Sequence, residues 1–168
     1  MWWRSARQGS RRALLIGALG LVAACAMTPA YGPGGTGSML RGHVSLRAPE
    51  SIDDFLLNRH LSDRLGPDDA PVYALDYRLT TATVGQGITP DDVTTRYSLN
   101  GTADFALTEI ATGATVTKGR VSSFTSYSAM GTTITTTSAE RDAHERLMVM
   151  LADQIMTRLL AGKPKPAP

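Results

Sequence analysis

The chain contains one cysteine, few aromatic residues and three histidines in 168 residues. A single cysteine excludes an internal disulfide framework and any metal site built from several thiolates. None of the histidines has a second ligand at the spacing that metal sites use. The sequence also lacks the G-x-S-x-G and H-E-x-x-H motifs of common hydrolases. We therefore expect no enzyme activity, no metal and no cofactor.

The first 24 residues have the composition of an export signal. Four arginines precede an uncharged apolar stretch from Ala13 to Ala24, which is too short to span a bilayer comfortably as a mature helix. The next residue completes the motif VAAC, which resembles the bacterial lipobox, where the cysteine thiol receives a diacylglyceryl group before cleavage. We predict a signal peptide over residues 1–24 and lipidation at Cys25. An ordinary secretory signal with a chance cysteine is the alternative.

Loss of the signal would change both the anchoring and the charge of the chain. Buried alkyl groups contribute about 0.8 kcal/mol per CH₂, so an acylated N-terminus would hold the protein to a membrane. Ala26 rather than Asp follows the cysteine, and by resemblance to enterobacterial lipoproteins this implies transfer to the outer membrane. The mature chain keeps 13 basic residues against 15 acidic ones, a net charge of −2. We therefore expect no nucleic-acid partner.

The remaining sequence predicts one domain between two irregular ends. Residues 25–39 are rich in proline, glycine and small side chains, which predicts a flexible tether. The domain covers residues 40–162, and residues 163–168 form a disordered tail. Hydrophobic alternation predicts four strands, near residues 41–49, 72–84, 94–110 and 115–130. We expect a bulge or a twist in the last strand, because its alternation slips between Val121 and Phe124.

Two amphipathic helices complete the domain. The first covers residues 52–65, between a capping sequence at Ser51 and the terminating Gly66. The second begins at Thr137 or Ser138, after a GTTITTT stretch that ends the sheet. Their apolar stripes consist of Leu57, Leu61 and Leu65 and of Leu147, Leu151, Ile155 and Leu159. The order β-α-β-β-β-α predicts an α+β two-layer sandwich, with both helices on one face of a mixed sheet of about four strands.

The opposite face of this sheet provides a candidate binding surface. If the odd-numbered strand residues face the helices, four basic residues project from the uncovered side. These candidates are Arg78, Arg96, Lys118 and Arg120. A basic face of this kind can dock an anionic partner. Because Asp76 and Asp104 are interspersed, ordinary solvent-facing residues are an equally open interpretation.

Four sequence blocks distinguish the mature chain. They are PAYG at 29–32, RYSL at 96–99, GRVSSFTSYSA at 119–129 and AERDAHERLMVMLADQIMTRLLA at 139–161. With these blocks the chain resembles the LPS-assembly lipoprotein family LptE, in its alphaproteobacterial form. The tether departs from the commoner family pattern, because Met27 and Ala30 stand where an aromatic residue and a leucine are usual.

The resemblance implies a similar fold and a non-enzymatic role. The protein would be an outer-membrane lipoprotein on the periplasmic side, largely inside an LptD-type β-barrel that it plugs and helps to assemble. It would bind lipopolysaccharide through basic residues and take part in its insertion into the outer leaflet. One alternative is a lipid-anchored structural or adaptor module of another envelope complex. Another is a lipid-anchored Ser/His hydrolase, although the sequence shows no catalytic triad.

Overall fold

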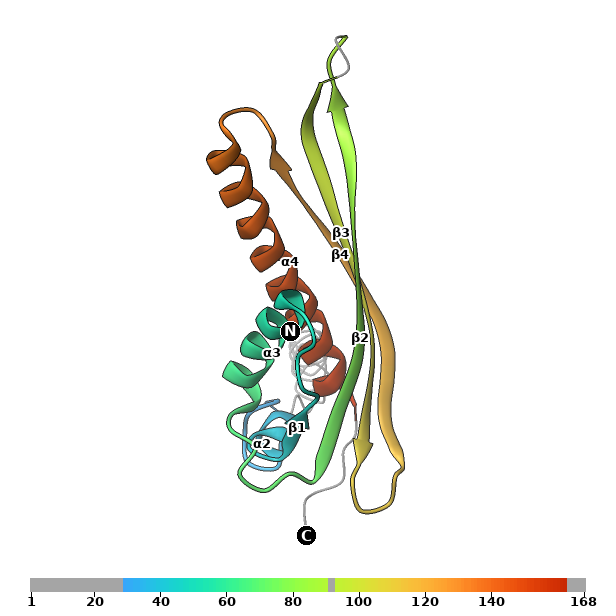
Figure 1. Cartoon of the computed structure of the whole chain (residues 1–168). Coiled ribbons are helices and arrows are strands. Elements are labelled where there is room, and N and C mark those ends of the chain that lie inside the picture. The colour runs from blue at the N-terminus through green and yellow to red at the C-terminus, as the bar shows by residue number, and fades with distance from the viewer. Residues whose placement is uncertain (1–28, 91–92, 163–168) are drawn as a thin grey trace, which may run out of the picture.

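The computed structural model describes residues 29–90 and 93–162 (Figure 1). The elements follow in the order α2 (Thr36–Leu40), β1 (Val44–Leu46), α3 (Ile52–Leu65), β2 (Tyr73–Ile88), β3 (Thr94–Glu109), β4 (Thr115–Ser128) and α4 (Thr133–Ala161). Apart from the short α2, this is the predicted β-α-β-β-β-α order. Within these residues, no helix has both the length and the apolar character needed to cross a membrane. The predicted signal peptide, Cys25 and the tail lie outside the described residues.

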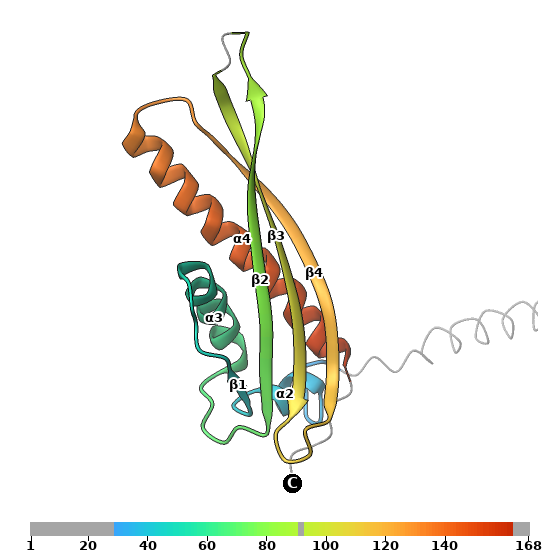
Figure 2. The same cartoon turned by 45° about the vertical axis from the view of Figure 1, so that its right-hand side comes forward.

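The four strands form one mixed sheet in the order β1-β2-β3-β4. β1 runs parallel to β2, with Val44 opposite Tyr73, and the other two strand pairs are antiparallel. A parallel pair needs a crossover connection, and α3 lies within it. Both α3 and α4 lie on one side of the sheet (Figures 1 and 2). None of the described helices covers the opposite side of β2, β3 and β4. The predicted α+β two-layer sandwich is confirmed.

The hydrophobic core lies between the sheet and the two long helices. Tyr73, Leu75 and Tyr77 of β2 are buried there, while the alternate residues of the strand point to the uncovered side. The predicted stripes of both helices are buried in full: Leu57, Leu61, Leu65, Leu147, Leu151, Ile155 and Leu159. A Cβ added to Gly101 of β3 would lie 2.9 Å from Leu147 Cδ2. The glycine therefore lets α4 pack closely on the sheet.

α3 begins and ends where the sequence predicts. The Ser51 hydroxyl accepts a hydrogen bond from the Asp54 backbone N–H at 3.0 Å, which satisfies a donor in the first turn. Gly66 ends the helix with a φ of 77°, a conformation that favours glycine. Local capping chemistry therefore defines the two ends of this helix.

α4 begins at Thr133, and the prediction of a start at Thr137 or Ser138 is wrong. Thr132 caps the helix by accepting from the Thr135 backbone N–H. Thr137 lies inside the helix, where its hydroxyl donates to the Thr133 carbonyl. β-branched residues are typical of strands, and for this reason the threonine-rich sequence predicts the end of the sheet here. Continuity with the packed part of α4 outweighs that preference.

β4 pairs with β3 without a register shift from Thr117 to Ser128, so the predicted bulge between Val121 and Phe124 is wrong. Phe124 lies on the uncovered side of the sheet and is 71% exposed. The slip in hydrophobic alternation therefore reflects an apolar residue facing solvent and not an inserted residue. The register shift of this pair lies between Leu107 and Thr108.

A short helix, α2, overlaps the end of residues 25–39, for which the sequence predicted a flexible tether and no helix. Its last residue, Leu40, is fully buried in the core. A Cβ added to Gly37 would lie 2.6 Å from Tyr31 Cδ1, so the glycine lets the tyrosine ring pack against α2. The domain therefore includes packed residues that precede β1.

Candidate functional site

Cross-strand pairing arranges the residues of the uncovered sheet face in rows. One row consists of Arg78, Asp104 and Arg120. The next row consists of Asp76, Ala106 and Lys118. The pairing of β2, β3 and β4 therefore brings three of the four predicted basic residues together, although they are far apart in the sequence.

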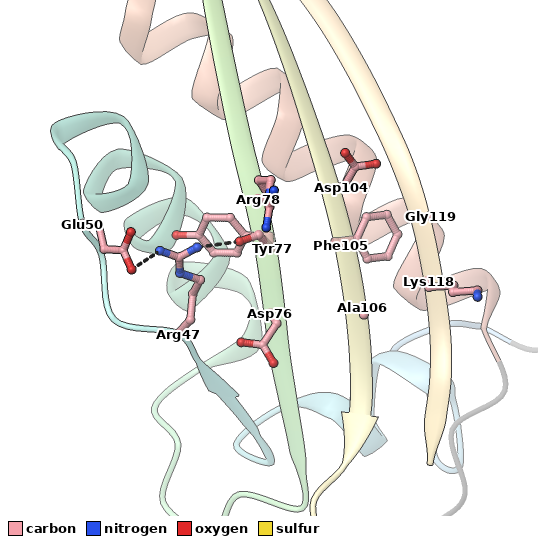
Figure 3. Close-up of a pocket in the computed structure, with 10 residues that line it drawn as sticks. All are labelled: Arg47, Glu50, Asp76, Tyr77, Arg78, Asp104, Phe105, Ala106, Lys118 and Gly119. Atoms are coloured by element: carbon pink, nitrogen blue, oxygen red, sulfur yellow. Dashed lines mark hydrogen bonds and ion pairs between the residues drawn. The ribbon is translucent and has the colours of Figure 1, made fainter. Parts of the chain in front are cut away.

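Arg78 and Asp104 of the first row and all three residues of the second row line an open depression of about 900 Å³. Arg47 and Glu50 lie at its β1 side, and Lys118 and Gly119 lie at its β4 side (Figure 3). Small-molecule sites are usually concave and bury most of their ligand. An open depression of this kind is better suited to part of a large ligand.

Arg120 is paired with Asp104 across the β3–β4 contact. Its Nε lies 2.6 Å from Asp104 Oδ1 and its Nη2 lies 2.9 Å from Oδ2, which makes a bidentate contact. The hydrogen bond from Arg120 lowers the pKa of Asp104, and the charge of Arg78 acts in the same direction. The same hydrogen bond raises the pKa of Arg120. The charge of Arg120 is therefore already balanced by a neighbouring carboxylate.

Arg78 and Lys118 are the available cations of the depression. Both side chains are exposed. Among the described residues, no ion pair joins either of them to a carboxylate. Both positive charges can therefore meet an anionic group of a ligand without first breaking a salt bridge, although the charge of Arg78 also acts on Asp104.

Arg96 lies on the same face but away from this cluster. It pairs with Ser128 and is eight residues from Asp104 along β3. At about 3.3 Å per strand residue, this separation is roughly 26 Å. The structure therefore places Arg96 at the other end of the uncovered face.

The depression has a further cation, Arg47, which no sequence pattern indicates. Its Nη1 donates to the Tyr77 carbonyl at 2.7 Å, and its Nη2 lies 2.8 Å from Glu50 Oε1. The guanidinium also lies over the Tyr77 ring, with Cζ 5.3 Å from the ring centroid. No local pattern could identify this residue, because its position depends on the parallel pairing of β1 with β2.

Among the described residues, the histidines form no catalytic triad or dyad with a nucleophile. Nδ1 of His144 lies 2.8 Å from Asp53 Oδ1, a contact that joins α4 to the first turn of α3. His43 Nδ1 lies 3.0 Å from the Ala70 carbonyl. In residues 29–90 and 93–162, no three His, Cys, Asp or Glu side chains are grouped to hold a metal ion. The uncovered sheet face is therefore the main candidate site.

Comparison with solved structures finds similar folds in bacterial lipoproteins. A Caulobacter crescentus CB15 protein described as a lipoprotein is 25% identical, with a TM-score of 0.62 over 75% of this chain and 93% of that chain. Rare lipoprotein B from Shewanella oneidensis is 15% identical, with a TM-score of 0.54 over 71% and 92%. A minor lipoprotein from Acinetobacter baumannii is 17% identical, with a TM-score of 0.51 over 73% and 95%. The last two likenesses concern the fold alone.

No curated protein matches the chain. Residues 43–159 match the protein family LptE, described as lipopolysaccharide-assembly. This match extends from the residue before β1 into the last turn of α4, so it covers the whole sandwich. The chain therefore belongs to the LptE lipopolysaccharide-assembly family, as the resemblance predicted.

Proposed function

We propose that this protein is a non-catalytic outer-membrane lipoprotein that plugs an LptD-type β-barrel and helps the barrel to assemble. In this role it takes part in the insertion of lipopolysaccharide into the outer leaflet. Membership of the LptE family supports the role in lipopolysaccharide assembly. Cys25, in the motif VAAC, supplies the membrane anchor as an acylated residue.

The observation that carries the binding proposal is the pair of available cations, Arg78 and Lys118, beside the open depression. Lipopolysaccharide is a large anionic glycolipid with phosphate groups. A planar guanidinium can bind phosphate through two hydrogen bonds, and an ammonium acts as a point charge. The depression is open enough to admit part of such a ligand, while Arg120 remains held by Asp104.

The surface of the sheet also supports the plug proposal. Next to the charged rows, the uncovered face carries a row of three hydroxyl side chains. These are Thr80, Thr102 and Ser122. The interior of a large outer-membrane barrel is polar and contains water, so this row of hydroxyl groups suits a position along its wall. The small net charge of the mature chain suits the same environment.

The lipopolysaccharide proposal is tested by the double variant Arg78→Ser/Lys118→Ser. Two exposed charged contacts contribute about 1–2 kcal/mol together, so the affinity for purified lipopolysaccharide should fall about 5- to 30-fold. Calorimetric titration at constant salt measures this change. The matched control, Arg141→Ser/Arg158→Ser, removes two exposed charges from α4 and should leave affinity close to that of the wild type. Equal losses in both double variants would contradict a site on the sheet.

The barrel proposal is tested by purifying the detergent-solubilised protein from outer membranes and washing it with high salt. A plug enclosed by its barrel should retain a stoichiometric LptD-type partner, which mass spectrometry identifies. A protein that emerges alone, or with other envelope components, would favour the adaptor alternative. Lipidation is tested by the mass of the N-terminal peptide, which should include the acyl groups on Cys25. In the variant Cys25→Ser this added mass should be absent, and the protein should no longer be found in the membrane fraction.

A further inference from the structure

Phe124 is an exposed aromatic residue in a polar part of the sheet. It lies on the uncovered face opposite Asn100, and its side chain is 71% exposed. Its neighbours on the same face of β4 are Ser122 and Ser126, which are both exposed. The ring is therefore surrounded by hydroxyl and amide groups on its own strand and on the adjacent β3.

This ring lies midway between the two basic ends of the face. The row that contains Arg78 and Arg120 is four residues away along β4, and Arg96 is four residues from Asn100 along β3. At about 3.3 Å per residue, each separation is roughly 13 Å. The row of Thr80, Thr102 and Ser122 fills the space between Phe124 and the charged rows. The face thus has cations at both ends and an aromatic ring with hydroxyl groups between them.

The side chains around Phe124 indicate which class of ligand could bind to this part of the sheet. An acyl chain needs a continuous apolar surface, whereas the residues next to Phe124 on β3 and β4 are polar and separate the ring from Ala82 and Val84 of β2. A sugar ring has an apolar C–H face, which packs on the electron-rich face of an aromatic ring, and a polar rim of hydroxyl groups. Serine, threonine and asparagine side chains can donate to and accept from such hydroxyls. The cations at both ends suit a saccharide that carries anionic groups.

We propose that the uncovered sheet face binds the saccharide part of its lipopolysaccharide ligand as an extended anionic oligosaccharide. One sugar ring stacks on Phe124, and its hydroxyl groups bond to the polar residues around it. Anionic substituents contact Arg78 and Lys118 at one end and Arg96 at the other. This inference rests on the proposed function and adds which part of the glycolipid the sheet recognises.

The test uses the lipoprotein beginning at residue 25 and deacylated lipopolysaccharide, which keeps the phosphorylated saccharide and lacks the acyl chains. Phe124→Ala should weaken binding of this probe about 2- to 10-fold, the range that one aromatic stacking contact supplies. The matched control is Phe55→Ala, which removes a ring that is 57% exposed on α3 and should leave the affinity unchanged. Calorimetric titration compares the three proteins, and circular dichroism checks that each is folded.

Phe124→Trp provides a second readout. Both tryptophans of the sequence precede residue 25, so in the protein beginning at residue 25 this variant has a single tryptophan, at the proposed stacking position, which can be excited selectively over the tyrosines. It should keep the affinity of the wild type and change its emission saturably as the oligosaccharide binds. A Phe55→Trp variant places the same fluorophore on α3 and should show no such change.

The outcomes separate this inference from the proposed function. Unchanged oligosaccharide affinity in Phe124→Ala would overturn the stacking contact and leave the lipopolysaccharide proposal standing. Binding of intact lipopolysaccharide without any binding of the deacylated form would overturn the saccharide inference alone. If the wild type binds neither form, the proposed function fails and this inference fails with it.

Discussion

Replacing Tyr77 with Phe should destabilise the protein at neutral pH and stabilise it relative to the wild type in strong alkali. The Tyr77 side chain is 4% exposed, and its hydroxyl donates to Asn58 Oδ1 at 2.8 Å. Tyr77→Phe removes this hydrogen bond and leaves the Asn58 oxygen without that donor. The free energy of unfolding at neutral pH should therefore fall by about 1 kcal/mol.

The alkaline effect follows from the pKa of the same hydroxyl. Burial raises the pKa of Tyr77 from 10.0 to about 12, and the charge of Asp54 acts in the same direction. Between these values the unfolded chain loses the phenolic proton while the folded protein keeps it. The stability that the folded protein gains by keeping Tyr77 neutral is therefore fully present below pH 10, and it is lost as the pH rises toward 12. The loss is about 1.4 kcal/mol at pH 11 and up to ~2.7 kcal/mol above pH 12.

The stability curves of the two proteins should therefore cross near pH 11, where the alkaline loss of the wild type has overtaken the missing hydrogen bond. Urea unfolding followed by circular dichroism, repeated from neutral pH to about pH 12, measures both curves. Other groups titrate in both proteins, so the difference between the curves isolates Tyr77. Parallel curves across this range would refute the assigned burial and pKa of this residue.

The control for this experiment is Asn58→Ala, which removes the hydrogen-bond acceptor and keeps the phenol. Its stability should fall at neutral pH, because Asn58 also donates to the Arg47 carbonyl at 2.8 Å. It should nevertheless keep the alkaline decline of the wild type, since the titrating hydroxyl is still present. The two variants thus separate the hydrogen bond from the ionisation.

Two further substitutions test the helices. Ser51→Ala should lower the free energy of unfolding by about 1 kcal/mol, because it removes the cap on the Asp54 N–H. Urea unfolding measures this change. The control is Ser62→Ala, at an exposed position of the same helix, which should change the stability little. Leu151→Ala removes a side chain with 0% exposure between α4 and the sheet, so unfolding should require about 3–5 kcal/mol less free energy. In that case, a loss below about 1 kcal/mol in the same assay would contradict the core position of Leu151.

Sequence patterns predicted the elements whose signals are local. Ser51 and Gly66 mark the two ends of α3, and alternating apolar residues mark β2 and β3, because capping and strand periodicity depend on near neighbours. The start of α4 escaped this reasoning. Its first turns contain β-branched residues that favour strands, and only attachment to the packed remainder of the helix makes them helical.

The candidate site was predictable in its composition but not in its geometry. Parity along the strands placed Arg78, Lys118 and Arg120 on the uncovered face. Their grouping into adjacent rows, and the separation of Arg96 from them, follow from the register of three strands. Register joins residues that are distant in the sequence, so it has no signature in any one segment.

The sequence by itself determined the α+β class, the helix stripes, the alternation of the strands and the family. Each of these depends on local periodicity or on motifs that one segment contains. The tertiary structure alone decided that Asp104 holds Arg120, that Arg47 lies against Tyr77, and that Phe124 faces solvent. The physical reason is that cross-strand pairing and layer packing are set by contacts among distant segments, which compete with local preference and outweigh it.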